Sequence, residues 1–105
     1  MYLKLDNKKI EIKKVIGIKD NFLGFMNKKN FKYGLLFRCN GIHTFFMKEN
    51  IDVILTDKNY KILYLYKDLK KNKIILPKKN VYYTIELPAQ SIKKLHIGDQ
   101  ISIHS

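Results

Sequence analysis

Four side chains near the middle of the chain combine a cation, an imidazole and apolar groups at alternating positions. Arg38 and His43 lie on either side of an Asn-Gly pair, and Phe45 and Met47 follow at every second position. If the Asn-Gly pair forms a tight hairpin turn, all four side chains share one face of a sheet. Such a face could bind a planar or anionic small ligand. The alternative is that Arg38 and His43 cap the solvent end of a sheet whose remainder is core.

Three more charged residues complete this candidate ligand site, namely Lys48, Asp52 and Glu86. A lysine and a carboxylate on neighbouring strands could form an acid–base pair with shifted pKa values. The structural alternative pairs Lys48 with Glu86 as ions, and lets Asp52 and Asp99 accept hydrogen bonds from backbone N–H groups of turns. We favour the structural alternative, because structural networks also supply such pairs.

Cys39 is the single cysteine, and His43 follows four residues later. In the predicted hairpin, Cys39 pairs with Ile42 and Arg38 pairs with His43, which places Cys39 and His43 on opposite faces and argues against a nucleophile–base pair. We therefore interpret Cys39 as a small buried hydrophobe. The histidines are too scattered to suggest a metal site, and no glycine-rich phosphate loop is present. We predict no catalytic residue, metal or cofactor, and a binding protein rather than an enzyme.

The net charge of +12 favours an anionic partner. All but one of the 21 basic residues are lysines, which recognise phosphate less specifically than arginine does. Because the chain is also rich in Ile and Asn, AT-rich codons are an alternative explanation of the charge. A sequence-nonspecific nucleic-acid surface is the alternative function, with tyrosines in the adjoining strands as stacking platforms. Its predicted cations are Lys67, Lys70, Lys71, Lys73, Lys78 and Lys79.

Short alternating apolar segments separated by turn residues predict a chain made mostly of strands. An N-terminal hairpin is expected over Tyr2–Ile12, and a second hairpin over Ile51–Tyr66 around Asp57. Further strands are expected at Leu35–Cys39, Ile42–Met47, Val81–Leu87 and Ile101–Ile103. Two short helices are expected, at Asn21–Asn27 and Ser91–Leu95.

Length and composition predict one globular domain over residues 1–105. The fold class expected is mostly β, a compact single-domain β-sandwich or barrel with one or two short helices. The longest apolar run, Ile62–Tyr66, is far too short for a membrane span, and the N-terminus has no apolar core of a signal peptide. These features predict a soluble, cytoplasmic protein. They do not predict an oligomeric state.

Four segments, taken in order, resemble the motifs of the domain of unknown function 192 family, also called uncharacterised protein family 0127. These segments are Leu23–Met26, Gly34–Phe37, Phe45–Lys48 with Asp52–Asp57, and Glu86–Ala89 with Ile97–Asp99. The family-like region covers about residues 10–103. The resemblance implies a compact, mostly β sandwich or barrel with small helices, and it implies no particular activity.

The chain departs from the family pattern at four positions. Leu23 replaces an arginine, Phe46 a tryptophan, Glu49 an asparagine and Gln90 a glycine. A polar site built from those positions would be altered in this chain. Taken together, the sequence predicts a non-enzymatic binding module for a small anionic or carbohydrate-like ligand, with nucleic-acid binding as the alternative.

Overall fold

The computed structural model describes residues 1–5, 8–15, 32–44 and 48–104. This part of the chain forms nine strands and no helix. The strands are β1 (Tyr2–Leu5), β2 (Lys8–Lys14), β3 (Gly34–Phe37), β4 (Ile42–His43), β5 (Ile51–Thr56), β6 (Ile62–Leu69), β7 (Ile74–Ile75), β8 (Tyr83–Pro88) and β9 (Ser102–His104). The expected class, a mostly β protein, is confirmed.

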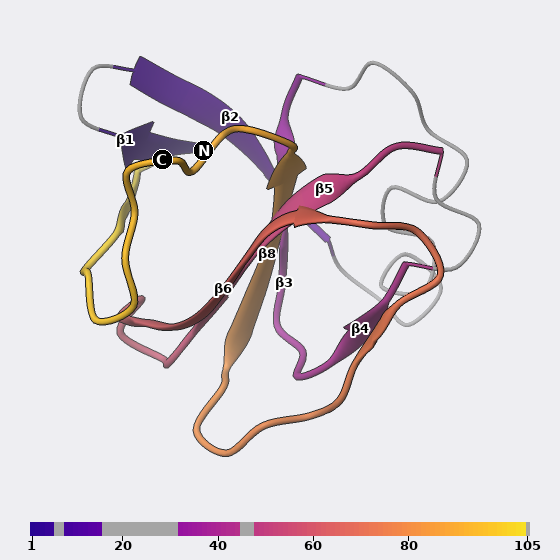
Figure 1. Cartoon of the computed structure of the whole chain (residues 1–105). Coiled ribbons are helices and arrows are strands. Elements are labelled where there is room, and N and C mark those ends of the chain that lie inside the picture. The colour runs from indigo at the N-terminus through magenta and orange to yellow at the C-terminus, as the bar shows by residue number, and fades with distance from the viewer. Residues whose placement is uncertain (6–7, 16–31, 45–47, 105) are drawn as a thin grey trace.

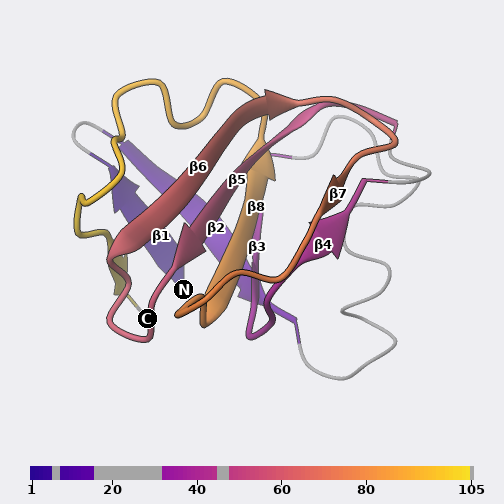
Figure 2. The same cartoon turned by 60° about the horizontal axis from the view of Figure 1, so that its bottom comes forward.

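Seven strands form one sheet in the order β6-β5-β8-β3-β2-β1-β9, and β4 pairs with β7 in a separate small sheet. Only the β2–β3 pair is parallel among these described strands. Figures 1 and 2 show that the large sheet curls, with β1 and β9 at one side and the small sheet at the other.

The two ends of the curled sheet approach each other just before β9. The Ile62 N–H donates to the Asp99 carbonyl at 2.9 Å, and the Gly98 N–H donates to the Ile62 carbonyl at 2.8 Å. An isolated bridge joins Lys61 to Gln100 beside them. The sheet is therefore a half-barrel whose first residues of β6 contact the segment that leads into β9.

Alternating side chains divide the apolar residues between two clusters, one on each face of the central strands. Leu36, Ile54 and Ile85 belong to the cluster inside the curl, together with residues of β1 and β2. Leu35 and Val53 belong to the other cluster, which also contains Ile75 of the small sheet. Burial of both faces explains why β5 is apolar almost without interruption.

Two predicted hairpins are present. β1 and β2 pair antiparallel with Leu3 opposite Ile10, and β5 and β6 pair antiparallel with Ile54 opposite Leu65. In the second hairpin the Asp57 carboxylate accepts the backbone N–H groups of Asn59 at 2.8 Å and Lys61 at 3.0 Å. This bonding is the turn chemistry expected of aspartate.

The predicted hairpin around Asn40-Gly41 is wrong. β3 lies between β2 and β8, and β4 pairs with β7 rather than with β3. The Asn40 side chain explains the difference, because its amide oxygen accepts the Lys78 N–H at 2.8 Å and its amide nitrogen donates to the Lys78 carbonyl at 2.5 Å. Gly41 has a φ of 96° and turns the chain out of the large sheet toward β7.

The helix predicted at Ser91–Leu95 is also wrong. That segment forms turns, with one backbone bond from the Leu95 N–H to the Ile92 carbonyl at 3.2 Å. Two further N–H groups of the segment, those of Ser91 and Ile92, are bound by a side chain instead of by a helical ladder. The helix predicted at Asn21–Asn27 lies outside the described residues.

Candidate functional site

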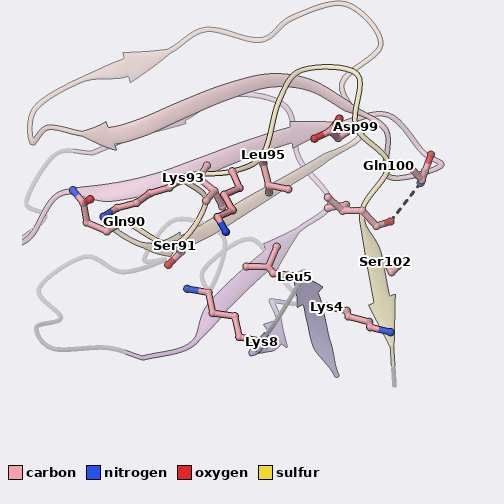
Figure 3. Close-up of a pocket in the computed structure, with 13 residues that line it drawn as sticks. Lys4, Leu5, Lys8, Gln90, Ser91, Lys93, Leu95, Asp99, Gln100 and Ser102 are labelled. Atoms are coloured by element: carbon pink, nitrogen blue, oxygen red, sulfur yellow. Dashed lines mark hydrogen bonds between the residues drawn. The ribbon is translucent and has the colours of Figure 1, made fainter.

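A groove with a volume of about 850 Å³ opens between the β1–β2 hairpin, the turns after β8 and the start of β9 (Figure 3). Four lysines line it, Lys4 and Lys8 from the hairpin and Lys93 and Lys94 from the turns. Leu5, Ile92, Leu95 and Ile101 supply apolar surface, and Gln90, Ser91, Asp99, Gln100 and Ser102 supply polar groups. A cavity of this size suits a small ligand.

The groove exists because β1 pairs with β9. Leu3 lies opposite Ile103, so the two ends of the chain are neighbours in the sheet. This pairing places Lys4 opposite Ser102, and the turns at residues 90–95 complete the lining of the groove. The N and C termini lie close together in Figure 1.

Asp52 holds the far wall of the groove in place. Its side chain is 1% exposed, and its Oδ2 accepts the N–H of Ser91 at 2.8 Å and the N–H of Ile92 at 3.1 Å. Its Oδ1 accepts the N–H of Asp68 at 2.8 Å. Asp52 therefore fixes the backbone that leads into Lys93 and Lys94.

The groove is cationic, with four lysines against a single carboxylate among its described lining residues. That carboxylate, on Asp99, accepts the backbone N–H of His96 at 2.9 Å and lies 3.8 Å from the His96 imidazole. Asp99 is thus engaged within its own turn. The four lysine side chains are all exposed, so an anion entering the groove would meet mobile ammonium groups.

The predicted ligand face around Arg38 is not assembled as expected. Arg38 is exposed beyond the end of β3, with its guanidinium 4.6 Å from the centre of the Tyr82 ring. The backbone of His43 pairs with Ile74 in the small sheet, and Lys48 is exposed. Phe45 and Met47 lie outside the described residues.

The two carboxylates of the predicted site face opposite sides of the sheet. Asp52 lies opposite Leu87, a residue of the cluster inside the curl. Glu86 is 5% exposed and lies opposite Val53, a residue of the other cluster. They therefore cannot act on one ligand. The expectation that Asp52 and Asp99 bind backbone N–H groups of turns agrees with the observed bonds.

Cys39 is half-buried beside β8, where Thr84 donates from its hydroxyl to the Cys39 carbonyl at 3.0 Å. Burial raises the pKa of the Cys39 thiol, and the nearby Glu86 raises it further. A raised thiol pKa disfavours the thiolate that a nucleophile needs. The described part of the chain contains no group of three or more histidine, cysteine and acidic residues that could hold a metal ion.

The six lysines predicted to bind nucleic acid divide between two places. Lys67 donates to the Lys93 carbonyl at 3.1 Å, beside the groove. The other five flank β7, where Lys78 lies 5.2 Å from the centre of the Tyr64 ring. The other predicted stacking residues, Tyr66, Tyr82 and Tyr83, already pack against neighbours. Tyr66 packs against the cluster outside the curl. Tyr83 is stacked on Tyr60 at 4.6 Å and in edge contact with Tyr82 at 4.7 Å.

Sequence reasoning missed the four lysines that line the groove. Each is one exposed lysine among many, and no motif links Lys4 or Lys8 to Lys93 or Lys94. The one local signal at this site is Gln90, where the chain departs from the glycine of the family pattern. Gln90 has a φ of 72° and lines the groove.

The fold is that of a small half-barrel domain also seen in two solved structures. A candidate transcription regulator from Sinorhizobium meliloti 1021 superposes with a TM-score of 0.83 at 16% identity, covering 96% of this chain and 89% of that one. A protein of unknown function from Novosphingobium aromaticivorans superposes with a TM-score of 0.81 at 8% identity, covering 97% and 82%. At these identities the likeness establishes the fold alone.

The chain belongs to the DUF192 family, whose model, described as "Uncharacterized ACR, COG1430", matches residues 1–103. A UPF0127 protein of Pyrococcus horikoshii is 40% identical over 100 residues, 82% of this chain and 84% of that protein. One of Thermococcus kodakarensis is 39% identical over 90 residues, 77% of this chain. The match covers only 57% of the Thermococcus protein, which is therefore longer than this chain. The family resemblance expected from the sequence is confirmed.

Within the described residues there is no helix of the length and apolarity needed to cross a bilayer.

Proposed function

We propose that this protein is a binding module for a small, multiply charged anion, which it holds in the lysine-lined groove. The single observation that carries the proposal is that four lysines, Lys4, Lys8, Lys93 and Lys94, line one groove. Several cations around a concave, partly apolar site concentrate anions and shield them from water. The proposal keeps the anionic ligand class expected from the sequence, but takes the groove rather than the surface around Arg38 as the site.

A carbohydrate-like ligand has less support. Sugar-binding sites commonly stack aromatic rings on the sugar, and none of the described residues that line the groove is aromatic. The groove instead offers ammonium donors above an apolar floor of leucine and isoleucine side chains. Carboxylate and phosphate oxygens are the acceptors that ammonium groups bind most strongly.

Binding without catalysis is the form of the proposal that the groove supports. Of its hydroxyls, that of Ser91 donates to the Pro88 carbonyl at 2.5 Å and so is already used within the turn. The one carboxylate, Asp99, is engaged with His96. No described lining residue combines a nucleophile with a base in contact with it.

Calorimetric titration with pyrophosphate, citrate and glucose tests the proposal. We expect the two anions to bind and glucose not to bind. The Lys93→Gln/Lys94→Gln variant should lose about tenfold in anion affinity, since each exposed ammonium contributes up to about 1 kcal/mol. The matched control is Lys14→Gln/Lys58→Gln, which removes the same charge from exposed positions outside the groove.

Two results would contradict the proposal. One is the absence of anion binding at about 50 mM salt, where screening is weak. The other is an equal loss of affinity in both double variants, because diffuse attraction by the net charge would then suffice.

Nucleic-acid binding through the five lysines that flank β7 receives less support from the structure than it did from the sequence. Base stacking needs free ring faces, and Tyr82 and Tyr64 each have a cation over the ring. Titration with labelled single-stranded RNA between about 50 and 200 mM salt checks this alternative, because phosphate-driven binding weakens steeply over that range.

A further inference from the structure

Strand β7 and the residue that follows it expose two large apolar side chains, those of Ile74 and Leu76. Ile75 is 5% exposed and packs into the cluster outside the curl, so its two neighbours in the strand direction point the other way. Ile74 is 59% exposed and Leu76 is 67% exposed. Ile97 is similarly exposed, at 64%, but Ile74 and Leu76 lie only two residues apart and together form an exposed apolar pair.

Lysines surround this apolar pair. Lys70, Lys71 and Lys73 precede Ile74, and Lys78 and Lys79 follow Leu76, with no acidic residue between positions 70 and 79. Lys78 is half-buried over Tyr64, and the other four are exposed. We call residues 70–79 the β7 tip. Along the chain it has an apolar centre with lysines on both sides.

The body of the domain holds the β7 tip at both ends. The Thr44 hydroxyl donates to the Lys70 carbonyl at 2.9 Å and accepts the Lys73 N–H at 2.7 Å. The backbone of Thr44 adds two more bonds, to Lys73 at 2.8 Å and from Asn72 at 3.1 Å. At the other end the Asn40 amide binds both backbone groups of Lys78. A surface fixed in this way loses little conformational entropy on docking.

We propose that the β7 tip docks the protein onto an anionic lipid surface. Ile74 and Leu76 would enter the boundary between headgroups and acyl chains, and the lysines would lie at the level of the anionic headgroups. Neither attraction is strong alone, and stable surface binding requires both. Nucleic acid fits this surface less well, because its phosphates would meet the exposed isoleucine and leucine.

Docking of the β7 tip leaves the groove accessible. Figures 1 and 2 both place β4 at one side of the molecule and the β1–β2 hairpin, which supplies Lys4 and Lys8 to the groove, at the other. Lipid binding and anion binding in the groove are therefore separate properties, and either can fail without the other.

The chain contains no tryptophan, so one introduced tryptophan is a clean reporter of insertion. Leu76→Trp places it on the β7 tip, and Ile97→Trp places it at a position that is 64% exposed outside the tip. The probe is a vesicle of phosphatidylcholine with about one-third phosphatidylserine, compared with pure phosphatidylcholine. We expect the tryptophan fluorescence of Leu76→Trp to shift to the blue and to be quenched by brominated acyl chains when anionic vesicles are added. Neither change should occur for Ile97→Trp, or for either variant with pure phosphatidylcholine.

Two variants of the protein separate the apolar from the electrostatic part. Ile74→Ser/Leu76→Ser keeps the charge and should lower vesicle affinity about tenfold, because both apolar side chains are lost from the interface. Lys70→Gln/Lys71→Gln/Lys73→Gln should lower it about a hundredfold, at about fivefold per lysine. The matched control, Lys14→Gln/Lys32→Gln/Lys58→Gln, removes the same charge from exposed positions outside both the tip and the groove and should lower it less than fivefold.

Three outcomes would overturn the proposal. The first is no sedimentation with anionic vesicles at low salt. The second is binding in which the tryptophan at position 76 stays exposed to water. The third is an unchanged vesicle affinity of Ile74→Ser/Leu76→Ser, together with tighter binding to single-stranded RNA than to vesicles, which would make the tip a polyanion surface. Thermal unfolding of each variant confirms that the exposed substitutions leave the fold intact.

Discussion

Replacing Asp52 with asparagine should destabilise the protein more than any other aspartate substitution in the described chain. The buried carboxylate accepts three backbone N–H groups, those of Asp68, Ser91 and Ile92. Asparagine has one acceptor oxygen in place of two. In either orientation of its amide, an NH₂ group faces at least one of these donors.

The expected loss follows from that count. A hydrogen bond to a charged group contributes about 1.5–3 kcal/mol, and bonds to a neutral acceptor contribute about half as much. Losing one bond and weakening the others costs about 2–4 kcal/mol in the free energy of unfolding. Asp52→Ala, which removes all three acceptors, should cost about 3–5 kcal/mol. Either loss is a large fraction of the stability of a small domain.

Urea unfolding followed by far-ultraviolet circular dichroism at neutral pH measures the loss. Asp99→Asn is the control, because the Asp99 carboxylate accepts one backbone N–H from His96 in a more exposed turn. Amide hydrogen exchange adds a local readout, and the N–H groups of Ser91 and Ile92 should exchange faster in Asp52→Asn. A loss below about 1 kcal/mol, or one no larger than in Asp99→Asn, would refute the reasoning.

Two further predictions concern stability. Gly34→Ala should cost about 1–3 kcal/mol in thermal or urea unfolding, because a Cβ there would lie 2.5 Å from methyl groups of both Ile12 and Leu87; a neutral effect would contradict the close packing of β3 between β2 and β8. Burial and a hydrogen bond with Tyr83 raise the pKa of Tyr60 to about 12. The folded state therefore keeps this proton longer than the unfolded state, and stability should fall as pH rises from about 10 to about 12. Tyr60→Phe should show a smaller fall in the urea midpoint between about pH 9 and about pH 11, and an identical fall in both proteins would contradict the pKa assignment.

The hairpins at both ends of the central sheet were predictable because their information is local. Nearly continuous apolar runs on either side of Asp57 specify β5 and β6, and the carboxylate completes the turn by binding the N–H groups of Asn59 and Lys61. The same rule failed at Asn40-Gly41. There the asparagine amide binds the backbone of Lys78, 38 residues away, and that long-range contact outweighs the local preference for a two-residue turn.

The groove was not predictable for a related reason. Its four lysines come from segments far apart in the sequence, the β1–β2 hairpin and the turns after β8, and only the folded chain brings these segments to one groove. In a chain with 21 basic residues, no lysine is distinguished by its type. The exposure of Ile74 and Leu76 was equally hidden, because the run from Ile74 to Leu76 is uniformly apolar and does not reveal which side faces water.

Asp52 and Glu86 show where prediction of a site from sequence fails first. Both were predicted as charged residues of the ligand site, and both are buried within their strands. Their strands are neighbours, with Asp52 opposite Leu87 and Glu86 opposite Val53. A shift of one residue in register exchanges the two faces of a strand. The register of β5 against β8 therefore decides whether the two carboxylates share a site. Here it separates them, leaving Asp52 to anchor the wall of the groove while Glu86 faces the opposite core.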